Sequence, residues 1–589
     1  MNDAPTTPDP IEIAMEAEAS GQAPTGVAHE VLRKQSRLLG WQAARERAAF
    51  ALTLAGALVG VAVAVMLGSM VWRATHADGV VVRPFTTPAD LAADGLTGEA
   101  LAARVLDHIE EMRRKSGGSL TQTASGFSAA GGDGLRLEIP QTGISIGELD
   151  AYLRRWLGHE RSITGALART GDVLTLTVRY AGEPTVVVRG PASDPDGLIA
   201  EAADEVFGLA DPTLAVLAQP MTPQGHDRAM AIMARLRASR DRTERIFGYG
   251  FSADQIPDPH LALAYIAEAR RLGSKSALNY REESVLLLGL GRWEASRTAG
   301  LRTIAALKRD GEVRWMAGAQ TSVADGLRTN LAILVRDYAA AEAAAVRRND
   351  PALGPQRGFR PVAPMIAGQH DIARARAELA RAETLGLQSD TPPLGEVLFA
   401  AGDYAGAAAA YASASAYLDD LDATARAAGW PQSGASRFRR IPLMAERAMA
   451  MAEAGDVAGA ATLIGPTPAD CYPCILVRAR IAWLRGDLAA AERAYAEAAR
   501  LGPSLPMAHE AWARLALARG QPARAASLAR LAEARGPRWA DPVKLEADAL
   551  AATGDLKASL ARYDAALRLA PAWADLRRAR AALAARITP

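Results

Sequence analysis

Two cysteines form the most reactive pattern in this chain. The stretch ADCYPCILVRAR, residues 469–480, contains Cys471 and Cys474, and the 589-residue sequence has no other cysteine. Two thiols at this spacing can form a disulfide, exchange electrons with other thiols, or supply half of a zinc site. Which of these applies depends on the compartment, because disulfides persist mainly in oxidising surroundings.

The residues around this pair favour a local disulfide. A zinc site needs two further ligands, and the sequence has neither a second CxxC nor a histidine pair nearby. Thioredoxin-like chemistry needs its CxxC to open a helix beside a central sheet, and no β-α-β pattern surrounds these residues. We therefore expect Cys471 and Cys474 to form a disulfide clasp at a repeat junction, with regulatory redox switching as the alternative.

Catalytic signatures are absent elsewhere in the sequence. None of the eight histidines belongs to an HExxH motif, and no GxxxxGK[ST] phosphate loop occurs. We expect no catalytic residue, cofactor or metal, and hence a protein that is not an enzyme. The 67 basic and 66 acidic residues give a net charge of +1, which leaves no basic excess to bind nucleic acid.

One long uncharged segment predicts contact with a lipid bilayer. Residues 48–72 contain no charged side chain. As a helix they would extend roughly 37 Å, which is enough to cross a hydrocarbon core of about 30 Å. A cleaved signal peptide fits poorly, because the apolar run is too long and 47 residues precede it. We expect a single transmembrane helix.

The charges beside this segment predict its orientation. Five basic residues lie before it and two follow it closely: Arg33, Lys34, Arg37, Arg45 and Arg47, then Arg73 and Arg83. Since positive flanks stay in the cytoplasm, residues 1–47 are expected to be a cytoplasmic tail, mostly disordered with a basic flank. The carboxyl-terminal bulk would then lie in the periplasm of a bacterium, anchored in the inner membrane.

Residues 79–211 predict a small mixed α/β domain. Alternating apolar residues, turn dipeptides and helix caps indicate the order β-α-β-α-β-β-β-α. The expected strands are 79–85, 135–140, 162–169, 172–180 and 184–190, and the expected helices are 97–112, 145–157 and 196–209.

The opening of this domain resembles a known family. VVVRPF, followed by a loop and DGLTGEALAARVLDHI, is similar to the amino-terminal domain of the periplasmic protein TolB. The resemblance is confined to the α/β domain and implies an α/β fold in the cell envelope, without a catalytic role. The propeller that follows this domain in TolB has no counterpart in the sequence.

A 34-residue period dominates residues 222–589. Glycine, alanine and proline each recur three times at this spacing, and a further glycine pair lies upstream. The repeat-defining residues are Gly486, Gly520 and Gly554; Ala498, Ala532 and Ala566; Pro503, Pro537 and Pro571; and upstream Gly368 and Gly402. Weaker units centre on Gly291, Arg336 and Gly455. Such a period is typical of stacked helical hairpins.

This pattern resembles tetratricopeptide repeats, with glycine at the turn, alanine between helices and proline after the second helix. The resemblance implies seven to nine hairpins over about 222–570, then a capping helix over 572–585. Since a single hairpin cannot bury its apolar stripe, stacking should produce a superhelix with a concave groove. The predicted fold is α-dominated and multidomain: a transmembrane helix, the α/β domain and this α-solenoid.

The resemblance also implies which side chains face the groove. Early first-helix residues take this place: Arg480, Trp483, Met507, Glu510, Arg514 and Lys544. Arg480 and Arg514 occupy equivalent positions of adjacent repeats and could together bind a carboxylate. The alternative, which we favour, is a solvated charged face in which nearby Glu510 and Asp548 balance these cations.

These patterns predict a membrane-anchored scaffold or assembly factor that binds a protein or peptide in its groove. The first alternative is an envelope sensor that signals across the membrane through a recruited partner. A remote alternative is a CxxC thiol redox protein.

Overall fold

The computed structural model describes residues 80–115, 127–129, 161–220, 222–308, 317–350, 359–387, 393–430 and 434–587, with short pieces before residue 73. The chain divides into two compact units. The first comprises Met1–His108 and Ala124–Val206, and the second comprises Ile109–Thr123 and Phe207–Pro589.

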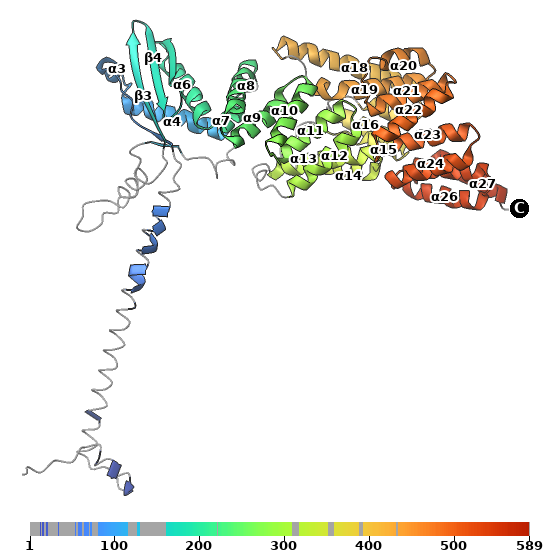
Figure 1. Ribbon diagram of the computed structural model, residues 1–589, viewed down its shortest axis with the longest axis horizontal. Coiled ribbons are helices and arrows are strands. Elements are labelled where there is room, and N and C mark those ends of the chain that lie inside the picture. Colours follow the sequence, from blue (N-terminus) through green and yellow to red (C-terminus); the bar gives the residue numbers. More distant parts are fainter. Residues whose placement is uncertain are drawn as a thin grey trace, which may run out of the picture. The chain divides into compact units, whose positions relative to one another are not determined.

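The first unit contains a five-stranded sheet in the order β2-β1-β3-β4-β5 (Figure 1). The short strand β1 runs parallel to both β2 and β3, whereas β3, β4 and β5 pair antiparallel. The strands are β1 Val80–Val82, β2 Phe127–Ala129, β3 Arg161–Thr170, β4 Val173–Tyr180 and β5 Val186–Pro191.

Alternation along the strands builds the core of this unit. In β3 and β4, every second side chain is buried over the central part of the strand, including Ile163, Leu176 and Val178, as period-2 patterning requires. Helices α4 (Gly98–Lys115) and α6 (Pro195–Ala210) lie against the sheet (Figure 1).

Most predicted elements of the α/β domain occur where the sequence placed them. The structure also has two elements that the sequence analysis missed, β2 and the short helix α3 (Ala89–Ala93). The expected strand 135–140 and helix 145–157 lie outside the described residues.

The second unit is a solenoid of antiparallel helix pairs (Figure 1). Helices α11 to α26 form successive hairpins after a more irregular start, and α27 covers the last hairpin. The bounds are α7 Pro212–Ala218, α8 Pro223–Ala238, α9 Arg242–Gln255, α10 Pro259–Arg271, α11 Ala277–Gly289, α12 Trp293–Leu307, α13 Ala317–Leu334, α14 Tyr338–Arg348, α15 Ala363–Gly368, α16 Ile372–Thr384, α17 Leu394–Ala400, α18 Tyr404–Ala427, α19 Gly434–Glu453, α20 Val457–Ile464, α21 Tyr472–Leu484, α22 Leu488–Leu501, α23 Met507–Ala518, α24 Pro522–Arg535, α25 Ala540–Ala552, α26 Leu556–Leu569 and α27 Ala574–Ile587.

The residues that define the 34-residue period have the predicted places in the last repeats. Ala498, Ala532 and Ala566 are fully buried between helices. Gly486, Gly520 and Gly554 each adopt a positive φ at the turn within a hairpin, where a side chain would be strained. Pro503, Pro537 and Pro571 are exposed in the loops that follow the second helices.

Gly368 does not follow this pattern, and its predicted place at a turn is wrong. It is not a turn residue but the last residue of α15, and a Cβ built there would lie 2.6 Å from the Tyr338 ring. The turn of this hairpin uses His370, with a φ of 62°, as the α13–α14 turn uses Arg336, with a φ of 59°. The 34-residue spacing to Gly402 therefore does not mark equivalent positions.

Within the part of the chain that the structure describes, no helix has both the length and the apolar character to cross a bilayer. Of the 25 residues of the predicted span over 48–72, the structure describes 13, in short helical pieces.

Two consecutive repeats differ in the side chain at the N-cap of the second helix. Asp487 accepts a hydrogen bond from the Ala490 N–H at 2.9 Å, whereas its repeat equivalent Gln521 makes no side-chain cap bond. Replacing a capping Asp by Ala costs about 1 kcal/mol. Asp487→Ala should therefore lower the melting temperature measured by circular dichroism, and Gln521→Ala should leave it nearly unchanged. Equal losses in both variants would contradict this role of the cap.

Candidate functional site

The early hairpins of the solenoid contact the late ones. The turns of α11–α12, α13–α14 and α15–α16 pack against the starts of α21, α23, α25 and α27. We call these three contacts the closure interface and number them in chain order. The paired segments lie roughly five repeats apart, so the interface forms where the superhelix returns onto itself.

The first contact joins the cysteine motif to the α11–α12 turn. The Tyr472 N–H donates to the Gly291 carbonyl at 2.9 Å, and Arg292 pairs with Asp470 at 2.7 Å. A Cβ built on Gly291 would lie 2.5 Å from the Cys471 Sγ. The turn glycine therefore allows the two segments to approach.

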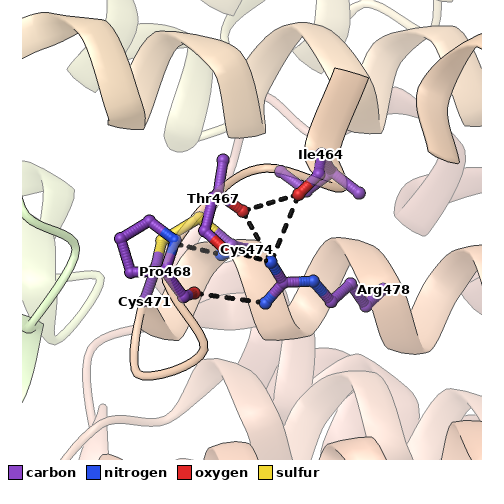
Figure 2. Close-up of a disulfide and its surroundings, with 6 residues drawn as sticks. All are labelled: Ile464, Thr467, Pro468, Cys471, Cys474 and Arg478. Atoms are coloured by element: carbon purple, nitrogen blue, oxygen red, sulfur yellow. Dashed lines mark hydrogen bonds between the residues drawn. A yellow bond between two sulfur atoms is a disulfide. The ribbon is translucent and has the colours of Figure 1, made fainter. Parts of the chain in front are cut away.

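Cys471 and Cys474 form a disulfide in the structure (Figure 2). Both residues are fully buried, and Cys471 caps α21 by accepting a hydrogen bond from the Cys474 N–H. The disulfide thus lies at the start of a first helix, where the sequence placed the clasp.

Arg478 holds the loop that precedes the disulfide (Figure 2). Its guanidinium donates to the carbonyl oxygens of Ile464, Thr467 and Pro468, at 3.2, 2.7 and 3.3 Å. Burial lowers the pKa of Arg478. The bond to Ile464 satisfies the last carbonyl of α20, where a cation is favourable, and the other two bonds hold the loop.

The second contact is mainly apolar. Leu334, Met507 and Trp539 belong to one buried cluster that joins the α13–α14 turn to α23 and the start of α25. The Arg336 guanidinium lies 5.9 Å from the Trp539 ring centroid and donates to the Tyr338 hydroxyl at 2.8 Å.

The third contact is polar and aromatic. The His370 ring stacks on Trp573 with centroids 3.5 Å apart and planes inclined by 5°, and its Nε2 lies 2.9 Å from the Asp541 Oδ2. Burial raises the pKa of Asp541, but the interactions with His370 and Arg514 outweigh it and leave that pKa below its ordinary value.

The closure interface covers part of the predicted groove. Met507 is only 4% exposed and packs against the α13–α14 turn, and Glu510 is 6% exposed. Arg514 pairs with Glu510 and Asp541, and Lys544 pairs with Asp548 at 2.7 Å. These four predicted groove residues are therefore already engaged within the chain.

The other two predicted groove residues, Arg480 and Trp483, lie on α21. Arg480 makes two hydrogen bonds to Glu453, at 2.7 and 2.8 Å, and its guanidinium lies 4.2 Å from the Trp483 ring centroid. Leu484 beside them is 39% exposed. Arg480 and Arg514 are thus paired separately with the chain's own carboxylates and do not form a joint carboxylate site.

Sequence reasoning missed a charged group between α17 and α19. The guanidinium of Arg439, on α19, has its Nη2 3.8 Å from the Oε1 of Glu396 on α17 and 3.3 Å from the Oε2 of Glu446. Burial, and then the nearby Glu446, raise the pKa of Glu396 to about 7. These charged residues do not recur at the 34-residue period, so no periodic signal marked them. Among the described residues, no group of His, Cys, Asp or Glu could hold a metal ion.

Comparisons with known proteins give a fold likeness only. No family model and no curated protein matches the chain. Similar solved structures include the APC/C hetero-tetramer Cut9-Hcn1, with a TM-score of 0.31, 9% identity, and coverage of 66% of this chain and 86% of that chain. Yeast Tom70 has a TM-score of 0.23 and 11% identity, with coverage of 65% of this chain and 85% of that chain. The P58(IPK) TPR domain has a TM-score of 0.17 and 10% identity, with coverage of 67% of this chain and 96% of that chain.

These TM-scores are too low to carry an argument, so the tetratricopeptide-like architecture rests on the chain's own helix pairs and their period. The comparisons give no support to the resemblance to TolB.

The first closure contact generates a prediction about two turn glycines. Gly291→Ala and Gly486→Ala both place a side chain at a positive φ, which costs about 1–2 kcal/mol. Only the Gly291 Cβ would meet the buried Cys471 sulfur, whereas nothing lies within 4 Å of the Gly486 Cβ. Overpacking adds about 1–3 kcal/mol, so thermal denaturation should show the larger loss for Gly291→Ala. Equal losses would mean that the turn does not pack on the disulfide.

Proposed function

We propose that this chain is a non-enzymatic scaffold that binds a protein or peptide in its predicted groove, over α19 and α21. The observation that carries the proposal is the pair formed by Trp483 and Arg480, beside the exposed Leu484. Aromatic and arginine side chains at a groove surface are the types that dominate protein recognition.

We further propose that residues 48–72 anchor the protein in a bacterial inner membrane, with the solenoid in the periplasm. The lack of any charged side chain in this segment supports the proposal. Described helical residues of the segment, such as Leu58, Val61 and Val65, are at least 60% exposed. Such apolar surface is stable only against lipid or another apolar partner.

The alternatives differ in what supports them. An envelope sensor that signals through a recruited partner would use the same groove and remains the second candidate. Thiol exchange requires an accessible sulfur, and the full burial of Cys471 and Cys474 argues against the redox alternative.

Photo-crosslinking in living cells tests the binding proposal. A benzoylphenylalanine at position 483 should capture a partner protein in a discrete adduct, which mass spectrometry then identifies. The matched control is position 493, because Arg493 is exposed on α22 outside the predicted groove. The same adducts from both positions, or none from position 483, would contradict binding in the groove.

Protease treatment of spheroplasts tests the location. The solenoid should be degraded by protease added outside, whereas a cytosolic marker protein should survive until the cells are lysed. A solenoid that survives with the marker would place the carboxyl-terminal bulk inside the cell and contradict the proposed orientation.

A further inference from the structure

His370 is, with Arg336, one of two residues other than glycine at the positive-φ position of a described hairpin turn. Among the described hairpin turns of the solenoid, six others, including those at Gly291 and Gly402, have glycine at the positive-φ position. A histidine in this conformation pays a steric cost that glycine avoids. The contacts of the His370 side chain with Asp541 and Trp573 offset this cost.

That surface consists of two residues from different helices. Trp573 precedes α27 and offers the face of its indole, while Asp541 in the first turn of α25 offers a carboxylate oxygen. Together they form a notch that accepts a flat ring on one side and an N–H donor on the other. The imidazole of His370 satisfies both requirements from a segment 171 residues earlier in the chain.

The notch offers an acceptor oxygen beside an aromatic face. The second oxygen of Asp541 interacts with Arg514, which also pairs with Glu510, and Arg336 also interacts with the Asp541 charge. Lys544, 6.0 Å from the Trp573 centroid, is paired with Asp548. Removal of His370 would take away its bond to the Asp541 Oδ2 and leave that oxygen beside the face of Trp573.

The third contact is also the most easily opened part of the closure interface. The first contact is built on the buried disulfide loop and the second on an apolar cluster. Across the third, His370 contributes one ring stack and one hydrogen bond. Displacing a ring stack and a single bond is compatible with an intact fold, whereas separating an apolar cluster is costly.

We propose that the His370 turn is an autoinhibitory plug in a binding site formed by Trp573 and Asp541, and that the ligand is an arginine side chain of a partner peptide. A guanidinium is planar, always charged and rich in N–H donors, so it stacks on an aromatic face and bonds a carboxylate at once. A lysine ammonium carries the same charge but is not planar, so it lacks the flat face that stacks on an aromatic ring. This inference rests on the proposed scaffold function and adds a second, regulated site to its groove.

The test uses His370→Gly in the full-length, detergent-solubilised protein. Glycine suits the positive φ of this turn, so the variant should fold. Fluorescence anisotropy with a fluorescein-labelled tetra-arginine peptide should show an affinity about tenfold higher than that of the unmodified chain, because the competing plug is removed. His260→Ala, on the exposed start of α10, is the matched control and should bind like the unmodified chain.

Two further binding measurements test the chemistry of the site. Adding Asp541→Asn to His370→Gly should abolish the gain, and a labelled tetra-lysine peptide should show little gain. The inference is overturned if His370→Gly binds tetra-arginine no better than the unmodified chain, or if tetra-lysine gains as much. Amide hydrogen exchange over α11 and α12 should be unchanged in the variant; faster exchange there would attribute a gain to unfolding and also overturn the inference.

This test is separate from that of the proposed function. Failure to capture a partner from position 483 would contradict the scaffold function without changing the peptide result at the His370 turn. Conversely, capture at position 483 together with unchanged tetra-arginine binding would leave the scaffold and remove the plug.

Discussion

The return of the solenoid onto itself is the constraint on which the rest of the second unit depends. A helical hairpin buries its apolar stripe only against neighbours, and here the neighbours include hairpins roughly five repeats away. Gly291, Met507 and His370 each take part in this return. Because the contacts recur at successive turns, the position of each late helix is fixed by an early one as well as by its sequence neighbours.

The charged residues of the predicted groove are paired within the chain. Over α23 and α25, Arg514 interacts with Glu510 and Asp541, and Lys544 interacts with Asp548. Over α21, Arg480 binds Glu453 and lies over the Trp483 ring. Buried carboxylates such as Glu510 are tolerated only when they are paired, so these pairs allow charged residues to line the helices that the return brings together.

The disulfide has a structural place in this arrangement. It begins α21, holds the loop that Arg478 also binds, and supports the α11–α12 turn. The spacing of Cys471 and Cys474, together with the lack of further metal ligands and of a β-α-β pattern nearby, predicted a clasp whose geometry is local. The turn that rests on the clasp, at Gly291, belongs to a hairpin far earlier in the chain, and no local pattern reveals it.

The sequence by itself determined the last repeats, with their turn glycines and buried alanines, because these depend on contacts within one repeat or between adjacent repeats. It determined strands β1, β3, β4 and β5 for the same reason, since their alternation is local, but it missed the three-residue strand β2. Only the tertiary structure decided that Met507 is covered, that Gly368 accommodates the Tyr338 ring, and that His370 meets Asp541. These outcomes depend on the superhelical curvature summed over several hairpins, which no single repeat encodes.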